Sequence, residues 1–173
     1  RCCSPAATRS RSWSGSRPAS FAPRFRSNAR CATRTAAERH FTNSTSRTAN
    51  SGSWYARLGG VGAVATRTLW QSVSIPSGRT SATLRYYLKI DTAESATETT
   101  PYDKLAVQVR SSTGSLLMTC ANFSNLDKIT SYQQRTCDLT QFIGQTVRVH
   151  FNMTEDETLQ TSFVIDDTAL TVQ

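Results

Sequence analysis

The sequence predicts an all-β chain that folds as an antiparallel β-sandwich. Apolar and polar residues alternate in several short runs, most regularly over residues 82–91, as expected for strands with one buried face. Turn-forming segments such as Pro76-Ser77-Gly78 separate these runs. No stretch has the periodicity of an amphipathic helix, and seven or eight short strands at regular spacing are typical of a sandwich.

Three strands are predicted in the first half of the sandwich. The first, at residues 54–58, ends before the pair Gly59-Gly60, and the second, at residues 69–75, ends at a proline. The third occupies residues 82–91 and has a polar face and an apolar face. Its predicted core residues are Leu84, Tyr86, Leu88 and Ile90.

Five further strands are predicted after a Thr/Glu-rich loop at residues 91–101. Ser112-Thr113-Gly114 is the expected hairpin turn between the first two, and an acidic turn at residues 154–157 leads to the last. Residues 121–130 are predicted to be a loop. The expected strands are residues 105–110, 116–120, 132–139, 147–153 and 162–172.

The last predicted strand contains two adjacent carboxylates, Asp166 and Asp167. Strict alternation places Asp167 on the same face as Phe163 and Ile165, and Asp166 on the opposite face with Val164. Whichever face is buried, one carboxylate then lies in an apolar row. Because an unpaired buried carboxylate is costly, we expect this one to have hydrogen-bond donors, a basic partner or a metal.

Residues 1–48 differ sharply in composition from residues 49–173, which we predict to be the sandwich domain. Residues 1–50 hold ten arginines and one acid, a net charge of +9, whereas residues 51–173 hold ten Lys/Arg against eleven acids. No Leu, Ile or Val precedes Leu58. The basic segment is therefore predicted to be disordered, because it cannot bury enough surface to offset its ordering entropy. A polyanion-binding arm and translation in a wrong reading frame are the alternatives.

Two of the five cysteines, Cys120 and Cys137, lie in the predicted domain and flank a loop. We predict a disulfide between them, with a pair of free buried thiols as the alternative. Closing a loop of this length would stabilise the fold by about 3 kcal/mol. A disulfide favours an oxidising compartment. The sequence has no zinc-binding cysteine spacing.

Six short runs follow one another in the order of a known family pattern. They are Ser-Gly-Ser-Trp-Tyr-Ala-Arg-Leu-Gly-Gly at 51–60, Gln-Ser-Val-Ser-Ile-Pro at 71–76, Tyr-Leu-Lys-Ile-Asp at 87–91, Tyr-Asp-Lys-Leu-Ala-Val at 102–107, Thr-Glu-Asp at 154–156 and Phe-Val-Ile-Asp-Asp at 163–167. Together, over about residues 42–173, they resemble the C-terminal ancillary domains of secreted bacterial proteases. That galactose-binding-like jelly-roll pattern is also similar to MAM domains and to calcium-stabilised carbohydrate-binding modules.

The resemblance implies a secreted, non-catalytic accessory domain of a hydrolase, in the first place a protease, with the parent catalytic domain as its partner. Such a domain would target a polymer, a cell surface or the parent enzyme. The alternatives are a carbohydrate-binding module for a glycan, a binder of a peptide polymer, and a structural cap that aids folding or secretion. No specific nucleic-acid partner is expected, and no apolar run is long enough to span a membrane.

Catalytic signatures are missing from the sequence. It contains no Gly-x-Ser-x-Gly, no His-Glu-x-x-His, no phosphate-binding loop and no dinucleotide fingerprint. His150 is the single histidine of the predicted domain, and we expect it on a surface or ligand-binding face. We therefore predict that the chain is not an enzyme.

Acidic residues near the strand ends suggest a structural Ca²⁺ site, because this ion takes oxygen ligands from irregular loops. The alternative is a set of solvated loop acids with one aspartate bound by backbone N–H groups. The candidate ligands are Asp91, Glu94, Asp103, Asp156, Asp166 and Asp167.

A ligand-binding face is predicted on one strand, where Arg85, Tyr87 and Lys89 project together. Arg148 and His150 are expected to join them from a neighbouring strand. An aromatic ring flanked by long donors can bind a sugar or a peptide, and in that case Tyr87→Ala would abolish binding. The alternative is an ordinary solvent-exposed face.

Trp54 and Trp70 are predicted to be core residues, because each lies within an apolar strand pattern.

Overall fold

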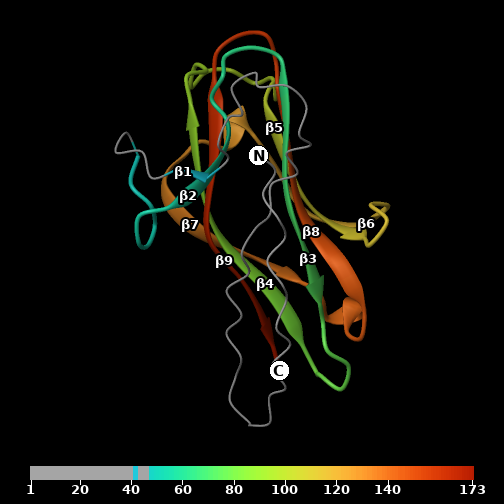
Figure 1. Cartoon of the computed structure of the whole chain (residues 1–173). Helices are drawn as coiled ribbons and strands as arrows, with labels where there is room; N and C mark the ends of the chain where they lie inside the picture. The colour runs from blue at the N-terminus through green and yellow to red at the C-terminus, as the bar shows by residue number, and fades with distance from the viewer. Residues whose placement is uncertain (1–40, 43–46) are drawn as a thin grey trace, which may run out of the picture.

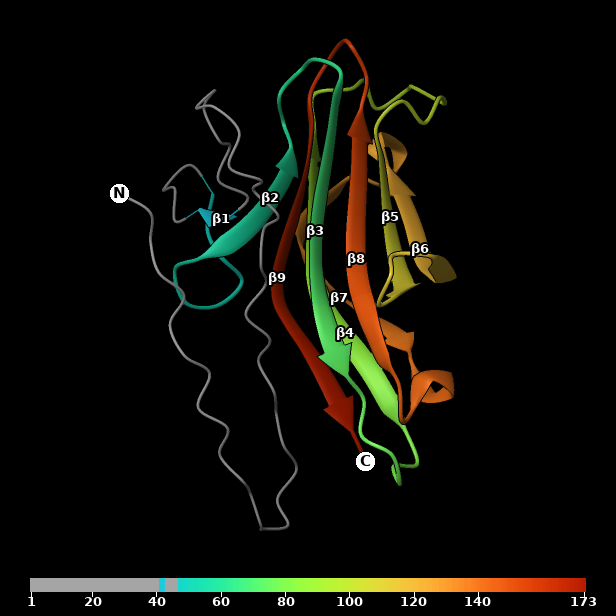
Figure 2. The same ribbon diagram turned by 45° about the vertical axis from the view of Figure 1, so that its right-hand side comes forward.

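The computed structural model describes residues 41–42 and 47–173, so most of the basic segment, with its predicted disorder, lies outside the described residues. The prediction of an antiparallel β-sandwich is confirmed (Figures 1 and 2). The strands of the described residues are β1 (Phe41–Thr42), β2 (Tyr55–Gly59), β3 (Ala65–Ser74), β4 (Ala82–Thr92), β5 (Lys104–Ser111), β6 (Leu116–Ser124), β7 (Ile129–Asp138), β8 (Thr146–Glu155) and β9 (Thr161–Val172).

Two sheets form the layers of the sandwich. The five-stranded sheet has the order β1-β2-β9-β4-β7, and the four-stranded sheet has the order β3-β8-β5-β6 (Figure 2). All neighbouring strands are antiparallel. Apart from β1–β2 and β5–β6, every connection carries the chain from one sheet to the other. Neighbours within a sheet are therefore mostly distant in sequence.

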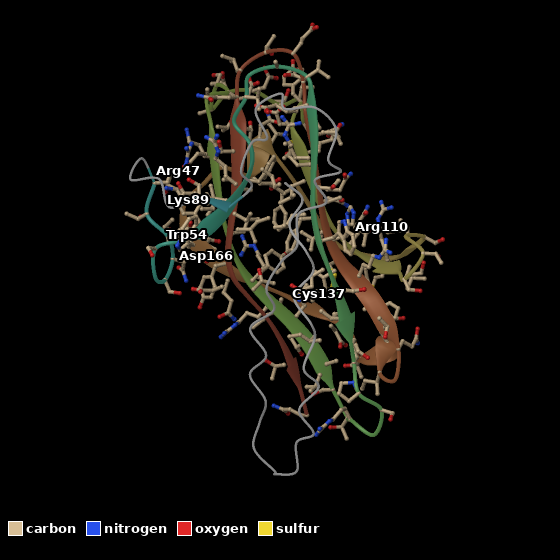
Figure 3. The ribbon with its side chains drawn as sticks, viewed as in Figure 1. Arg47, Trp54, Lys89, Arg110, Cys137 and Asp166 are labelled. Atoms are coloured by element: carbon tan, nitrogen blue, oxygen red, sulfur yellow. A yellow bond between two sulfur atoms is a disulfide. The ribbon has the colours of Figure 1, made fainter. Side chains whose placement is uncertain are left out.

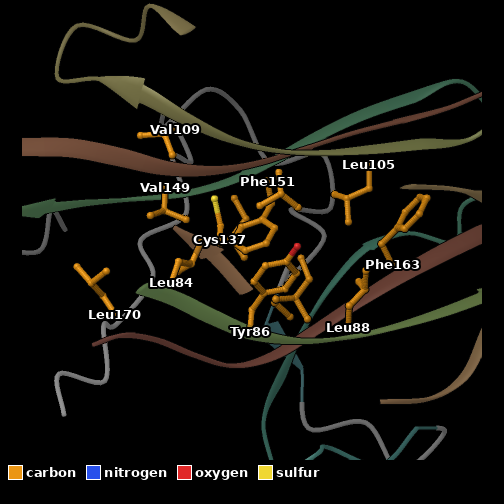
Figure 4. Packing of buried hydrophobic residues seen from close by; sticks show 14 of the residues in the cluster. Leu84, Tyr86, Leu88, Leu105, Val109, Cys137, Val149, Phe151, Phe163 and Leu170 are labelled. Carbon is orange, nitrogen blue, oxygen red and sulfur yellow. The ribbon is translucent and has the colours of Figure 1, made fainter. Parts of the chain in front are cut away.

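The core lies between the two inner faces and is filled by alternate residues of the strands (Figure 4). Tyr86 of β4 and Phe151 of β8 meet across the layers, with ring centroids 5.4 Å apart in an edge-to-face arrangement. The predicted core face of β4 is confirmed, since none of its four residues is more than 1% exposed. They are Leu84, Tyr86, Leu88 and Ile90.

The strict alternation predicted for β9 is wrong. At Asp166 and Asp167 the pairing with β4 shifts register, and Asp167 adopts a φ of 44°. Phe163 and Ile165 face the core before this bulge, and Leu170 faces it afterwards, so the phase of the strand reverses. Both carboxylates consequently lie outside the core, so the apolar row of β9 contains neither of them.

The predicted disulfide between Cys120 and Cys137 is confirmed. Cys120 belongs to β6 and Cys137 to β7, which are edge strands of different sheets. The bond therefore ties the two layers together along one open side of the sandwich.

The predicted loop at residues 121–130 is partly wrong, because β6 continues to Ser124. Phe123 pairs with Leu105 of β5, and its side chain packs against the core. A 3₁₀ turn, η1 (Asn125–Asp127), follows and is closed by a capping box between Ser124 and Asp127. The Asn/Ser-rich sequence has no clear alternation, which explains why the strand was missed.

A second 3₁₀ turn, η2 (Thr140–Phe142), connects β7 to β8. In the part of the chain that the structure describes, no helix is long and apolar enough to cross a membrane.

Candidate functional site

The outer face of the four-stranded sheet carries a row of aromatic and polar side chains. Leu69, Val109 and Val149 point into the core, so the residues beside them in the sequence point outward. In the register of the sheet, Trp70 of β3 lies opposite His150 of β8, and His150 lies opposite Gln108 of β5. The three strands thus place one residue each in a single row.

A second row, two residues along each strand, contains two guanidinium groups. Arg148 of β8 lies directly opposite Arg110 of β5. We call the surface made by these two rows the Trp70 face; its residues are Trp70, Gln108, Arg110, Arg148 and His150. The label of Arg110 marks this side of the sandwich in Figure 3.

Arg148 and Trp70 form one stacked unit. The guanidinium carbon of Arg148 lies 4.5 Å from the centroid of the Trp70 ring, a cation–π contact. The Nε atom of Arg148 is buried and has no hydrogen-bond partner among the described residues. The indole is half-buried on the surface, and the planar guanidinium of Arg148 lies against its ring.

Arg110 is held in place by neutral acceptors. Its Nε and Nη2 donate to Oε1 of Gln108 at 3.0 and 2.7 Å, and its Nη1 donates to the carbonyl of Gly114 at 3.1 Å. Both contacts keep the guanidinium in one orientation, and no described residue provides a counter-ion for its charge.

His150 is neutral at neutral pH. Burial, followed by the positive charges of Arg110 and Arg148, lowers the pKa of His150 from 6.5 to about 4. Its Nδ1 is buried without a hydrogen-bond partner in the described part of the chain. The imidazole adds an uncharged polar group beside the Trp70 ring.

A hollow of about 410 Å³ adjoins the Trp70 face over β8, β5 and β6. In the register of the sheet, Ala106 lies between Asn152 of β8 and Asn122 of β6, and its short side chain leaves this space open. Lys104 lines one end of the hollow. Asp127 also lines it, and its Oδ2 accepts from the N–H and the hydroxyl of Ser124.

The residues predicted to form the ligand-binding face lie on two opposite surfaces. Arg85, Tyr87 and Lys89 belong to β4 of the five-stranded sheet, whereas β8 belongs to the other layer. Outward side chains of β4 and β8 therefore point away from each other. Figure 3 shows Lys89 of β4 and Arg110 of β5, a neighbour of β8, on opposite sides of the sandwich. The expectation that Arg148 and His150 join the β4 residues is wrong, because β8 is not a neighbour of β4.

On the five-stranded sheet, residues 47–51 contact the outward residues of β4 and β9. Nε of Arg47 donates to Oδ2 of Asp91 at 2.8 Å, and the N–H of Asn50 donates to Oδ2 of Asp166 at 2.7 Å. This segment covers part of the face. Elsewhere on that sheet, the hydroxyl of Tyr87 donates to Oε1 of Gln134 at 3.1 Å. Nζ of Lys89 lies 3.6 Å from Oδ1 of Asp91 and forms an ion pair with it.

Asp166 and Asp167 act as acceptors for this segment. The carboxylate of Asp167 accepts from Nδ2 of Asn50 at 2.7 Å and from the hydroxyl of Ser51 at 2.5 Å. Burial raises the pKa of Asp166, although the N–H groups of Asp167 and Asn50 oppose this shift. From the sequence, hydrogen-bond donors, a basic partner or a metal are expected for one of these acids, and the structure provides hydrogen-bond donors for both.

By their partners, the six predicted metal ligands divide into three groups. Asp91 pairs with Arg47 and Lys89, and the β9 pair contacts residues 50 and 51. The third group is Glu94, Asp103 and Asp156. Within the described ranges, no three acidic, histidine or cysteine side chains are placed to hold a metal ion by themselves.

The third group contains two carboxylate oxygens that lack a partner. Asp103 is fully buried, and its Oδ1 accepts from the N–H of Asp156 at 2.9 Å. Its Oδ2 and the Oε1 of Glu94 are buried without a hydrogen bond from any described residue. Burial, and then the charges of Asp103, Asp156 and Glu98, raise the pKa of Glu94. A cation bound to Asp103 would meet an otherwise unsatisfied oxygen.

The prediction that both tryptophans are core residues is wrong. Trp54 is 54% exposed, and Trp70 lies on the outer face of β3. The alternation of Leu69 and Gln71 already places Trp70 on the opposite face. Gln108 and Arg110 were not among the predicted site residues, and their row with His150 becomes visible only when the strand order is known.

No protein-family profile and no curated protein matches this chain. Among solved structures, it resembles TmCBM61 in complex with β-1,4-galactotriose, at 12% identity and a TM-score of 0.52, over 77% of this chain and 81% of that one.

Two further carbohydrate-binding modules resemble the chain at lower TM-scores. The Family 16 Carbohydrate Binding Module-2 has 15% identity and a TM-score of 0.40, over 71% of this chain and 79% of that one. The CBM22-1 xylan-binding domain from Paenibacillus barcinonensis Xyn10C has 11% identity and a TM-score of 0.42, over 74% and 78%. At these identities the likeness concerns the fold: the chain is a β-sandwich that resembles carbohydrate-binding modules.

Proposed function

We propose that this chain is a non-catalytic glycan-binding module and that the Trp70 face, with the adjoining hollow, is its sugar-binding site. One observation carries the proposal: a half-buried indole lies in a sheet face among the donors Arg148, Gln108 and His150. A sugar has an apolar face and a rim of hydroxyl groups, so it fits an aromatic ring with polar groups around it.

The fold likeness to TmCBM61 supports this function over the accessory role that the sequence resemblance puts first. Secretion is part of the proposal, because the disulfide favours an oxidising compartment. An attachment to a secreted hydrolase such as a protease, a peptide ligand and a purely structural role stay predictions from the sequence.

The test is native affinity electrophoresis of the full chain in gels that contain single polysaccharides: β-1,4-galactan, xylan or polygalacturonate. We expect retardation by at least one of them, and we expect Trp70→Ala to weaken that binding about tenfold or more, as for loss of a central aromatic anchor. Trp54→Ala is the matched control, since it removes an exposed indole elsewhere and should bind normally. Binding that survives Trp70→Ala unchanged would contradict the proposed site.

We also propose a structural Ca²⁺ ion next to Asp103, with Glu94 and Asp156 as further candidate ligands. The unpartnered Oδ2 of Asp103 and Oε1 of Glu94 support this proposal. Because Ca²⁺ takes six to eight oxygens, backbone carbonyls and water would have to complete its coordination. The ion would stabilise the β4–β5 connection rather than contact the Trp70 face.

A further inference from the structure

The strands of the four-stranded sheet have an unbalanced charge on their outer face. Lys104, Arg110 and Arg148 project there, whereas none of the outward positions on β3, β8 and β5 is acidic. Residues 51–173 as a whole hold ten Lys/Arg and eleven acids. The positive charge of these strands is therefore local to this face, and Asp127 of η1 adds one carboxylate to the adjoining hollow.

The two arginines of the face repel each other. Arg110 and Arg148 are directly opposite in the register, and like charges at such positions destabilise a sheet. Neither forms an ion pair with a described residue: Arg110 binds an amide and a carbonyl, and Arg148 lies over an indole. The ion pairs found among the described residues involve Arg47 and Lys89 with Asp91, on the other sheet. An anion bound between the two guanidinium groups would remove the repulsion.

The third cation lies far along the same strand. Lys104 and Arg110 are six residues apart on β5, which corresponds to roughly 20 Å. Ala106, at the floor of the hollow, lies between them. This separation spans several sugar units, so a polymer can reach both cations at once whereas a monosaccharide cannot.

We propose that the Trp70 face selects acidic polysaccharides, with Arg110 and Arg148 binding a ligand carboxylate or sulfate group while Trp70 contacts a sugar ring. Guanidinium groups suit both anions because each offers several N–H donors. Nε and Nη2 of Arg110 already donate to Gln108, so the anion would bind the remaining Nη protons of Arg110. The inference rests on the proposed glycan-binding function and adds the class of ligand.

The experiment measures binding of the full chain to polygalacturonate, dextran sulfate and neutral β-1,4-galactan by affinity electrophoresis at about 0.15 M salt, where surface charges are screened beyond roughly 8 Å. Residues 1–50 carry a net charge of +9 and attract any polyanion, so variants of equal charge must be compared. The test variant is Arg110→Gln/Arg148→Gln. The matched control is Arg79→Gln/Arg85→Gln, which removes two exposed arginines outside the Trp70 face.

We expect the test variant to bind polygalacturonate, dextran sulfate or both about tenfold more weakly, with a weaker dependence on salt, and the control to bind like the unchanged chain. Loss for polygalacturonate alone identifies the anion as a carboxylate, and loss for dextran sulfate alone identifies it as a sulfate. If the double variant folds poorly, the single variant Arg110→Gln replaces it, because this change leaves the Arg148–Trp70 stack intact. It should also bind the acidic polymer more weakly than the unchanged chain does.

Equal weakening in both double variants would overturn the inference, because general charge attraction would then explain the binding. Trp70-dependent binding of neutral galactan, without any preference for the acidic polymers, would also overturn it and would leave the proposed function standing. Binding of all three polymers that does not depend on Trp70 would defeat the proposed function itself.

Discussion

His150 lies beside the row that contains Arg110 and Arg148, and at the scale of single residues this position predicts a pH dependence of stability. Its pKa is about 4 in the folded chain and 6.5 for the ordinary imidazole, so the unfolded chain binds the proton first as pH falls. The free energy of unfolding should therefore decrease from about pH 6.5 to pH 4 through this residue.

Urea unfolding at pH 7 and pH 4.5 checks this expectation. The variant His150→Asn should lose less stability over the interval than the unchanged chain, because it no longer contains the group that titrates. Equal losses in the two proteins would show that His150 has the same pKa in the folded and unfolded states.

The alternation of apolar and polar residues predicted which side chains point into the core for most strands. The core positions of β4 follow from alternation alone, and so does the outward orientation of Arg148 and His150. The apolar strand pattern around Trp70 predicts a core residue, whereas its phase in that strand places it on the outer face. A large amphipathic side chain can lie in an outer face when a neighbour such as Arg148 packs against its ring.

Among the structural elements, the bulge of β9 predicts a specific sensitivity at Asp167. A φ of 44° is unfavourable for a β-branched residue, so Asp167→Val should reduce the free energy of unfolding by about 1–2 kcal/mol, and further through loss of the bonds to Asn50 and Ser51. Asp167→Asn is the control and should lie within about 0.5 kcal/mol of the unchanged chain, since Asn tolerates this conformation. Chemical unfolding of both variants would measure the difference. Similar free energies of unfolding for the two variants would contradict a positive φ at residue 167.

The disulfide between β6 and β7 predicts a second effect at this scale. Its removal by Cys120→Ala/Cys137→Ala should reduce the free energy of unfolding by about 3 kcal/mol, because the bond closes a loop across 17 residues. For a domain of this size we expect the melting temperature to fall by roughly 10 °C. Calorimetry of both proteins with and without a reductant provides the control. The reductant should lower the melting temperature of the unchanged chain and leave that of the variant as it is. A loss below about 1 kcal/mol would contradict the assignment of a stabilising bond between the layers.

The sequence contains no direct sign of the β9 bulge, because Asp166 and Asp167 continue the spacing of a regular strand. Only the mismatch of a carboxylate with an apolar row pointed to a problem there. The structure resolves it by inserting one residue, which moves both acids to the surface, where the donors of residues 50 and 51 meet them.

For the whole molecule, the proposed Ca²⁺ ion predicts a change in the melting temperature. Millimolar Ca²⁺ should raise it by several degrees relative to EDTA, since a ligand at a hundred times its dissociation constant stabilises the folded state by about 2.7 kcal/mol. Asp103→Asn should abolish the response, and Asp91→Asn, at an acid already paired with Arg47, should preserve it. No response in the unchanged chain, or a response that Asp103→Asn retains, would exclude the proposed ion.

The order of strands is the part of the fold that the sequence did not supply. Alternation defines strands one at a time, whereas pairing joins segments as distant as β3 and β8. The predicted ligand site therefore combined residues of β4 and β8, which lie in opposite layers. The site proposed here depends on β3, β8 and β5 lying side by side, which brings Trp70, His150 and Gln108 into one row.

The most direct test of this account is to locate the sugar on the sandwich. Amide and indole NMR signals of the labelled chain would be followed during titration with β-1,4-galactotriose and with trigalacturonate. We predict shifts that centre on the Trp70 indole, Gln108, Arg148 and His150, and that are larger for the acidic trisaccharide. Shifts centred instead on Arg85, Tyr87 and Lys89, on the other sheet, would contradict it.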